Sequence, residues 1–158
     1  MEFRIGDNVI HRIFGYGEIT DVEERVINGT RMTCYVVKVN HDTIWVPADM
    51  PGRNSLRSPT PPKEFINTIK ILTISPDSLD EDRVIRKKYL LDHLRDGQLT
   101  SICQVVRDLT HYKKIFKLND QEKSILEQAI KSLLEEWSLS LEIPPEKAQK
   151  SLEEMLQT

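Results

Sequence analysis

A proline-rich segment divides this chain into two parts whose apolar residues follow different periods. Residues 54–63 are rich in Ser, Arg, Thr and Pro, and three prolines fall within positions 59–62. Before this segment, short apolar runs alternate with Gly- and Asn-containing turn signals, which is typical of strands. After it, apolar residues recur every three to four positions, which is typical of helices. We therefore predict the α+β class, with a strand domain over residues 1–59 and a helical domain over residues 60–158.

The strand domain contains one strong hairpin signal. Asn28-Gly29 suits the positive φ angles of a type I′ turn, and β-favouring residues flank it at 25–27 and 32–39. Residues 40–42 predict the next turn, and Gly15-Tyr16-Gly17 predicts an earlier one. Four or five short antiparallel strands in under sixty residues can cover their apolar face only by curling. The expected fold is a small SH3-like or Tudor-like antiparallel β-barrel.

The second domain is expected to be entirely helical. The patterns predict helices over residues 63–72, 80–95 and 99–116, with Gly97 as a left-handed cap between the last two. Asn119 followed three residues later by Glu122 predicts a capping box that begins a fourth helix, and Pro144-Pro145 predicts the start of a fifth.

The helix predicted over residues 99–116 carries a continuous apolar stripe. Ile102, Val105, Val106 and Leu109 lie at i, i+3, i+4 and i+7, and Phe116 would extend the stripe by another seven residues. The opposite face is expected to be polar and to consist of Gln104, Arg107, Asp108, His111 and Lys114.

The positive charge of the chain is concentrated in one region. The whole chain has a formal net charge of −3, but residues 83–117 hold nine Lys or Arg and three Asp, a net charge of +6. Residues 118–158 hold four basic and nine acidic residues, a net charge of −5. A solvated helix face would also explain the basic residues, but a local excess in an acidic protein favours contact with nucleic acid or another polyanion.

Several function classes find no support in the sequence. Cys34 and Cys103 lack the neighbouring ligands of a metal site, and the four histidines are scattered. We expect no metal, no cofactor and no enzyme activity. The first residues do not resemble a signal peptide, and no apolar stretch approaches the length of a membrane span. We therefore expect a cytoplasmic protein without a membrane segment, and we also expect it to be a monomer.

The order of these elements and several short motifs resemble the CarD/CdnL family of bacterial transcription regulators. The first domain is also similar to the RNA polymerase-interacting module of transcription-repair coupling factors. The resemblance spans essentially the whole chain. The motifs that carry it are Phe3-Arg4-Ile5-Gly6-Asp7-Asn8-Val9-Ile10-His11, Gly15-Tyr16-Gly17, Tyr35-Val36-Val37, Val46-Pro47, Leu56-Arg57, Val105-Val106-Arg107-Asp108-Leu109 and Leu118-Asn119-Asp120-Gln121-Glu122-Lys123.

The resemblance implies a Tudor-like domain that docks on the RNA polymerase β subunit. It also implies a helical domain that touches promoter DNA just upstream of the melted region and stabilises the open complex. Arg25 matches a basic position that faces the polymerase in the family. Trp45 stands where a second contact, often an arginine, is found, so a stacking or apolar contact would replace a salt bridge there. Alternatively, Trp45 is a half-buried residue of the barrel.

The basic helix departs from the family pattern. Family members typically place a tryptophan shortly before a basic Tyr-Lys run, where it acts as a wedge against the minor groove, but residues 83–89 contain none. Trp137 is too distant and lies on an apolar face. Either Val84 or Ile85 provides a smaller wedge, or the wedge is weakened or lost. The expected DNA contacts comprise Arg83, Val84, Ile85, Arg86, Lys87 and Lys88, together with the later basic patch at Lys113 and Lys114.

Two functional hypotheses follow from these patterns and this resemblance. The first is a polymerase-bound transcription regulator that contacts promoter DNA through phosphates. The second is a polymerase-binding adaptor without a productive DNA contact.

Overall fold

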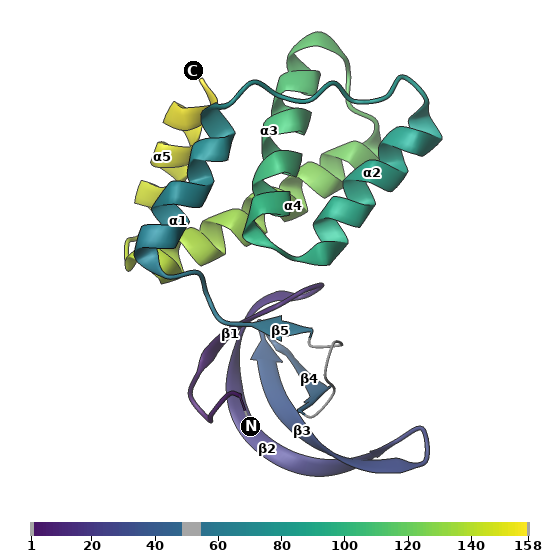
Figure 1. Ribbon diagram of the computed structural model, residues 1–158, viewed down its shortest axis with the longest axis vertical. Coiled ribbons are helices and arrows are strands. Elements are labelled where there is room, and N and C mark those ends of the chain that lie inside the picture. The colour runs from purple at the N-terminus through teal and green to yellow at the C-terminus, as the bar shows by residue number, and fades with distance from the viewer. Residues whose placement is uncertain (1, 49–54, 158) are drawn as a thin grey trace. The chain divides into compact units, whose positions relative to one another are not determined.

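The chain folds into two compact units. The computed structural model describes residues 2–48 and 55–157. Residue 54, the first of the proline-rich segment, therefore lies outside the described residues. The chain divides into Met1–Pro59, which holds the strands, and Thr60–Thr158, which holds the helices (Figure 1). This arrangement confirms the predicted fold class of a small antiparallel β domain followed by helices.

The first unit is a curved five-stranded antiparallel sheet. Its strands are β1 (Asn8–His11), β2 (Gly15–Ile27), β3 (Thr30–Val39), β4 (Asp42–Pro47) and β5 (Leu56–Arg57), in the order β4-β3-β2-β1-β5. One face of the sheet buries a core of apolar side chains, because alternate residues of each strand point to that face. This core consists of Phe3, Val9, Ile19, Tyr35, Val37, Val39, Val46 and Leu56.

The predicted hairpin at Asn28-Gly29 is confirmed. Ile27 pairs with Thr30, and the two turn residues have φ angles of 51° and 78°. The predicted turn at residues 15–17 is wrong, because these residues form the start of β2. A Cβ atom on Gly17 would lie 2.8 Å from a Val37 methyl group, so this glycine permits close packing between strands.

The second unit is entirely helical in its regular structure. Its elements are α1 (Pro62–Thr68), the 3₁₀-helix η1 (Ile69–Thr73), α2 (Arg83–Asp96), α3 (Leu99–Ile115), α4 (Asp120–Leu141) and α5 (Pro145–Leu156). The helix predicted over residues 63–72 is thus divided into an α-helix and a 3₁₀ turn. The helix predicted from residue 80 begins at Arg83, because the Asp82 side chain accepts hydrogen bonds from the amides of Val84 and Ile85 and caps it.

Helix α3 supplies the centre of the helical core. The predicted stripe of Ile102, Val105, Val106 and Leu109 is buried, and α3 packs against α2, α4 and η1. The extension of this stripe to Phe116 is wrong. That residue ends α3 in an extended conformation and is 55% exposed.

The predicted polar face of α3 is also wrong at two positions. Arg107 and Asp108 are only 5% and 1% exposed. They are buried because they neutralise each other: Arg107 Nε donates to Asp108 Oδ1 at 2.9 Å.

Helix boundaries follow the predicted caps. Asn119 and Glu122 form a reciprocal capping box, Gly97 takes a left-handed φ of 69°, and α5 begins at Pro145. The end of the proline-rich segment is fastened to α4, because the amide and hydroxyl of Thr60 both donate to the Glu136 carboxylate, at 3.0 and 2.6 Å.

Candidate functional site

The β unit presents a compact polar and aromatic cluster formed by Glu23, Arg25 and Trp45. The guanidinium carbon of Arg25 lies 3.9 Å from the centroid of the Trp45 ring, a cation–π distance. Glu23 Oε1 accepts from Arg25 Nε at 3.2 Å and from Trp45 Nε1 at 2.5 Å. Arg25 and Trp45, the two residues predicted to face the polymerase, therefore lie side by side, and Glu23 orients both.

Strand register explains how this cluster forms. Glu23 pairs with Cys34, and Val36 pairs with Trp45, so the cluster spans three adjacent strands on one face of the sheet. Trp45 remains 37% exposed, whereas Cys34 beneath the cluster is fully buried. Burial raises the pKa of the Cys34 thiol. Glu23 was missed at the sequence level, although its position two residues before Arg25 places it on the same strand face.

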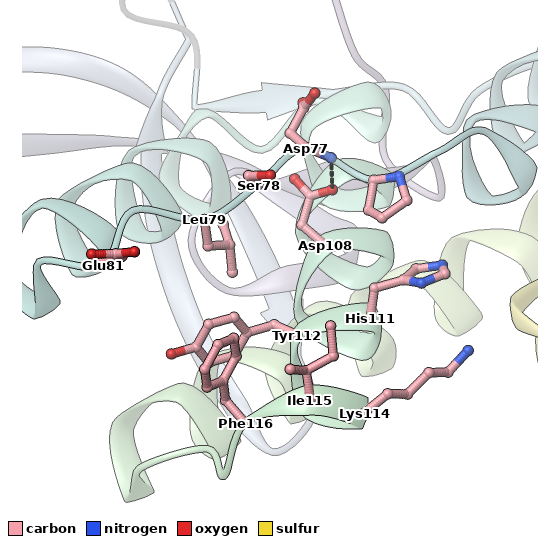
Figure 2. Close-up of a pocket in the computed structure, with 11 residues that line it drawn as sticks. Asp77, Ser78, Leu79, Glu81, Asp108, His111, Tyr112, Lys114, Ile115 and Phe116 are labelled. Atoms are coloured by element: carbon pink, nitrogen blue, oxygen red, sulfur yellow. Dashed lines mark hydrogen bonds between the residues drawn. The ribbon is translucent and has the colours of Figure 1, made fainter.

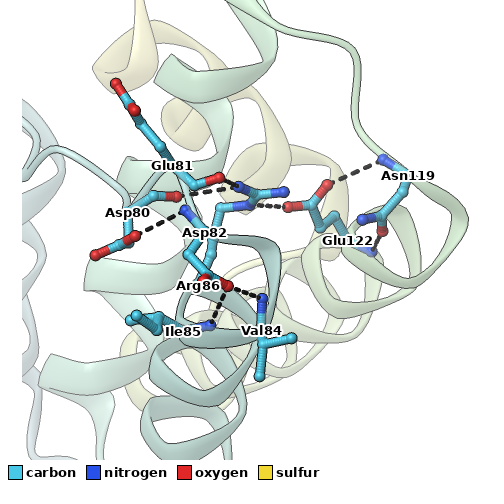
Figure 3. Close-up of polar contacts among 8 residues, drawn as sticks. All are labelled: Asp80, Glu81, Asp82, Val84, Ile85, Arg86, Asn119 and Glu122. Atoms are coloured by element: carbon cyan, nitrogen blue, oxygen red, sulfur yellow. Dashed lines mark hydrogen bonds and ion pairs between the residues drawn. The ribbon is translucent and has the colours of Figure 1, made fainter.

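The start of α2 exposes five of the six residues that were predicted there as DNA contacts, and Lys88 is among the five. Arg83, Val84, Ile85 and Lys87 are exposed, with Val84 and Ile85 at 75% and 54%. The side chains of Val84 and Ile85 point away from the contact between Arg86 and Glu122 (Figure 3). Neither Arg83 nor Lys87 has an acidic partner among residues 2–48 and 55–157. Both are free to contact phosphates.

Arg86 has a different environment from its neighbours. It is 8% exposed, and its Nε donates to Glu122 of α4 at 2.5 Å. Its Nη1 donates to the carbonyl oxygens of Asp80 and Glu81 (Figure 3). The hydrogen bond that Arg86 donates to the Glu122 carboxylate is the main reason that the Arg86 pKa is raised. Arg86 therefore joins α2, α4 and the preceding loop, and it does not lie on the exposed basic face.

Lys88 is exposed but already paired. Its Nζ lies 2.7 Å from Asp92 Oδ2, one helical turn further along α2. The Lys88 ammonium is the main cause of a lowered Asp92 pKa. An exposed pair of this kind contributes little stability, so Lys88 can exchange Asp92 for a phosphate.

The Val-Val-Arg-Asp-Leu string holds the loop that precedes α2. Asp108 Oδ1 accepts from the Asp77 amide at 3.1 Å, and Arg107 Nη2 donates to the Asp77 carboxylate at 3.2 Å. Asp108 also accepts from the Tyr89 hydroxyl at 3.3 Å. Burial and the Asp108 charge raise the Tyr89 pKa to about 12. This string is therefore a structural element that positions the start of α2.

A hollow of about 410 Å³ lies between that loop and the end of α3 (Figure 2). Asp77, Leu79 and Glu81 line it from the loop, and Tyr112 and Phe116 line it from α3. The predicted basic residues Lys113 and Lys114 are both exposed at this end of α3. Because the short connection at Gly97 makes α2 and α3 antiparallel neighbours, the start of α2 and the end of α3 lie at the same end of the helical unit (Figure 1).

Within residues 2–48 and 55–157, no group of three His, Cys, Asp or Glu side chains could hold a metal ion. No helix in the described part of the chain is long and apolar enough to cross a membrane. Cys103 is buried inside the helical core, and burial raises its pKa to about 12.

Comparisons with known proteins match both units. Residues 3–58 match the family model described as the CarD-like/TRCF RID domain, and residues 67–153 match the one described as the CarD C-terminal domain. A curated relative from Bacillus subtilis (strain 168), named "Putative transcription factor YdeB", is 28% identical over 140 residues. This alignment covers 85% of the present chain and 89% of the relative.

Proposed function

The chain belongs to the CarD family of transcription factors. We propose that it docks on the RNA polymerase β subunit and contacts promoter DNA at the upstream edge of the bubble. The family identifies it as a transcription regulator that interacts with RNA polymerase, and the family's members are non-enzymatic. We propose the β subunit as its docking site on the polymerase, promoter DNA as its second partner and a change in open-complex stability as its effect. We expect the protein to act as a cytoplasmic monomer.

The Glu23–Arg25–Trp45 cluster is the observation that supports docking through the β unit. Its side chains lie on the face of the sheet opposite the apolar core, and Glu23 and Trp45 restrict the rotamers of Arg25. A preorganised arginine loses less conformational entropy when it binds a carboxylate. Trp45 adds an exposed aromatic surface of the kind enriched in interface hot spots. In this arrangement Trp45 supplies no charge of its own, and it holds Arg25 for an acidic partner.

Affinity for the isolated β subunit tests this surface. Arg25→Glu should weaken binding by at least about tenfold, because a reversed charge at an interface places like charges opposite each other. Arg31→Glu is the matched control, since Arg31 is an exposed arginine of the same hairpin that pairs with Glu24 on the opposite face. Equal affinities for wild type and Arg25→Glu would exclude the cluster as the docking site.

Five unpaired cations support the DNA contact. They are Arg83 and Lys87 on α2 together with Lys113, Lys114 and Lys117 at the end of α3, and none has an acidic partner in the described part of the chain. If all five contact phosphates, the log–log salt slope on duplex DNA should be about −4.5. Such contacts position a protein without reading sequence, so docking on the polymerase would supply the remaining affinity.

The adaptor hypothesis has one observation in its favour. Of the four cations predicted to clamp phosphates on α2, Arg86 is buried and Lys88 is paired. A salt-dependent gel shift on forked promoter DNA separates the two hypotheses. The DNA-contacting regulator should shift the fork at low salt with a steep salt dependence, whereas an adaptor should leave it unshifted at every salt concentration.

A further inference from the structure

Two aromatic rings form a preformed stack at the end of α3. The centroids of Tyr112 and Phe116 are 4.8 Å apart, with an angle of 28° between the ring planes (Figure 2). Tyr112 is half-buried, whereas Phe116 is 55% exposed. One face of the Phe116 ring thus packs on Tyr112, and a large part of the remaining apolar surface of Phe116 is exposed to solvent.

The stack is anchored to the helical core through Arg86. The Arg86 guanidinium lies 5.2 Å from the centroid of the Tyr112 ring, and the same guanidinium is held by Glu122. The Phe116 amide also donates to the Tyr112 carbonyl at 2.8 Å, where the helix ends. Both rings are therefore fixed before any ligand arrives, which reduces the entropy lost on binding.

The surroundings of the stack are basic. Phe116 lies within an exposed run, residues 113–117, that holds three lysines and no acidic residue. None of these lysines has an ion-pair partner among the described residues. Lys114 extends away from the two rings, on the side opposite Glu81 (Figure 2). An exposed aromatic ring flanked by unpaired cations is the arrangement that single-stranded nucleic acids bind.

We propose that the Tyr112–Phe116 stack is a platform for one unpaired DNA base, with Lys113, Lys114 and Lys117 on the adjacent phosphates. This inference deepens the proposed function and rests on its DNA contact. The base stacks on the open face of Phe116. The site therefore distinguishes a fork, which offers an unpaired base, from a continuous duplex, whose bases are already stacked on one another.

The acidic loop limits how DNA can approach. Asp77 and Glu81 line the far side of the hollow, and Asp77 is neutralised in part by Arg107. The sugar-phosphate backbone of the DNA must then follow the surface that carries Lys113, Lys114 and Lys117. Glu81→Gln should strengthen fork binding severalfold at low salt, because it removes a repulsive charge near the platform.

The test measures fluorescence anisotropy of the full-length protein on two labelled DNAs, a forked duplex and the same sequence fully paired, over a salt series. Phe116→Ala should weaken fork binding by roughly tenfold, as loss of one base–aromatic stack does, and should leave duplex binding unchanged. The log–log salt slope should stay constant, since no charge is removed. The double variant Lys113→Ala/Lys114→Ala should instead weaken binding of both DNAs. Its log–log salt slope should be less steep, by the amount that about two phosphate contacts contribute.

The control variant is Ile66→Ala, because Ile66 is 51% exposed on α1 and lies outside the hollow. It should bind both DNAs like wild type, and Phe116→Trp should retain the preference for the fork.

If Phe116→Ala lowers the affinity for fork and duplex equally, or lowers neither, the base platform is refuted, but the phosphate contacts are not. Reduced polymerase affinity of Phe116→Ala with unchanged fork binding would identify a protein-docking surface instead. Failure of the wild type to bind either DNA would refute the proposed DNA contact as well.

Discussion

At the scale of single residues, Arg86 shows that a cation in the basic segment of the sequence need not lie on the basic surface of the fold. It lies between exposed cations in the sequence, yet it is buried against Glu122. Arg86→Met should lower the free energy of unfolding of the helical unit by about 3 kcal/mol, because the Glu122 carboxylate would remain buried without its partner. Urea denaturation followed by helical circular dichroism measures this change.

Arg83→Met provides the matched control, since Arg83 is exposed and unpaired within the described residues. Its free energy of unfolding should stay within about 0.5 kcal/mol of wild type. Adding Glu122→Gln to Arg86→Met should restore part of the loss, because the amide is neutral and can still accept from the Asn119 amide. A variant Arg86→Met as stable as Arg83→Met would show that the buried pair contributes nothing.

Residue-level features were predictable from the sequence where the cause is local. The hairpin at Asn28-Gly29, the Gly97 cap and the Asn119–Glu122 capping box each depend on residues within a few positions of one another. The burial of Arg86 and Arg107 could not be predicted in this way. Glu122 lies 36 positions from Arg86, and Asp77, which Arg107 contacts in addition to the adjacent Asp108, lies 30 positions from Arg107, so only the tertiary fold brings these residues together.

At the scale of elements, the connection between β1 and β2 depends on a neutral histidine. His11 Nδ1 accepts from the amides of Ile13 and Phe14 at 3.0 and 3.1 Å, and the ring contacts Phe14. Burial, and then the charge of Arg12, lower the pKa of His11 below 6.5. Protonation of Nδ1 would remove both acceptor contacts, and Ile13 and Phe14 are exposed on this connection. The loop therefore keeps its conformation only while His11 is neutral.

The sign of the pH effect follows from the lowered pKa. As pH falls through about 6.5, the unfolded state binds a proton before the folded state does, so the free energy of unfolding of the β unit decreases. Urea denaturation of wild type and His11→Ala between pH 7.5 and 5 measures this effect. The free energy of unfolding should depend more steeply on pH in wild type, because the variant lacks the histidine that titrates in this range. Parallel curves for the two proteins would refute this dependence.

At the scale of the whole molecule, the two units are expected to fold independently. Each has its own apolar core, and Thr60 is fastened within the helical unit by Glu136. Separate fragments 1–59 and 60–158 should each unfold cooperatively, with urea midpoints within about 0.5 M of the corresponding transitions in the full chain. Loss of helical circular dichroism in the fragment 60–158 would show that this unit requires the first.

We propose that the β unit docks on the polymerase and that the helical unit contacts DNA, and the lifetime of promoter open complexes distinguishes these two roles. Lifetimes should be measured over a salt series with polymerase plus wild type, Arg25→Glu or Lys113→Ala/Lys114→Ala. Wild type should lengthen the lifetime, and Arg25→Glu should abolish the effect by removing docking. The double-alanine variant should keep its affinity for the β subunit but lose most of the effect, with the salt dependence flattened by about two phosphate contacts. A double-alanine variant that matches wild type at every salt concentration, while Arg25→Glu is inactive, would contradict the DNA contact and favour the adaptor.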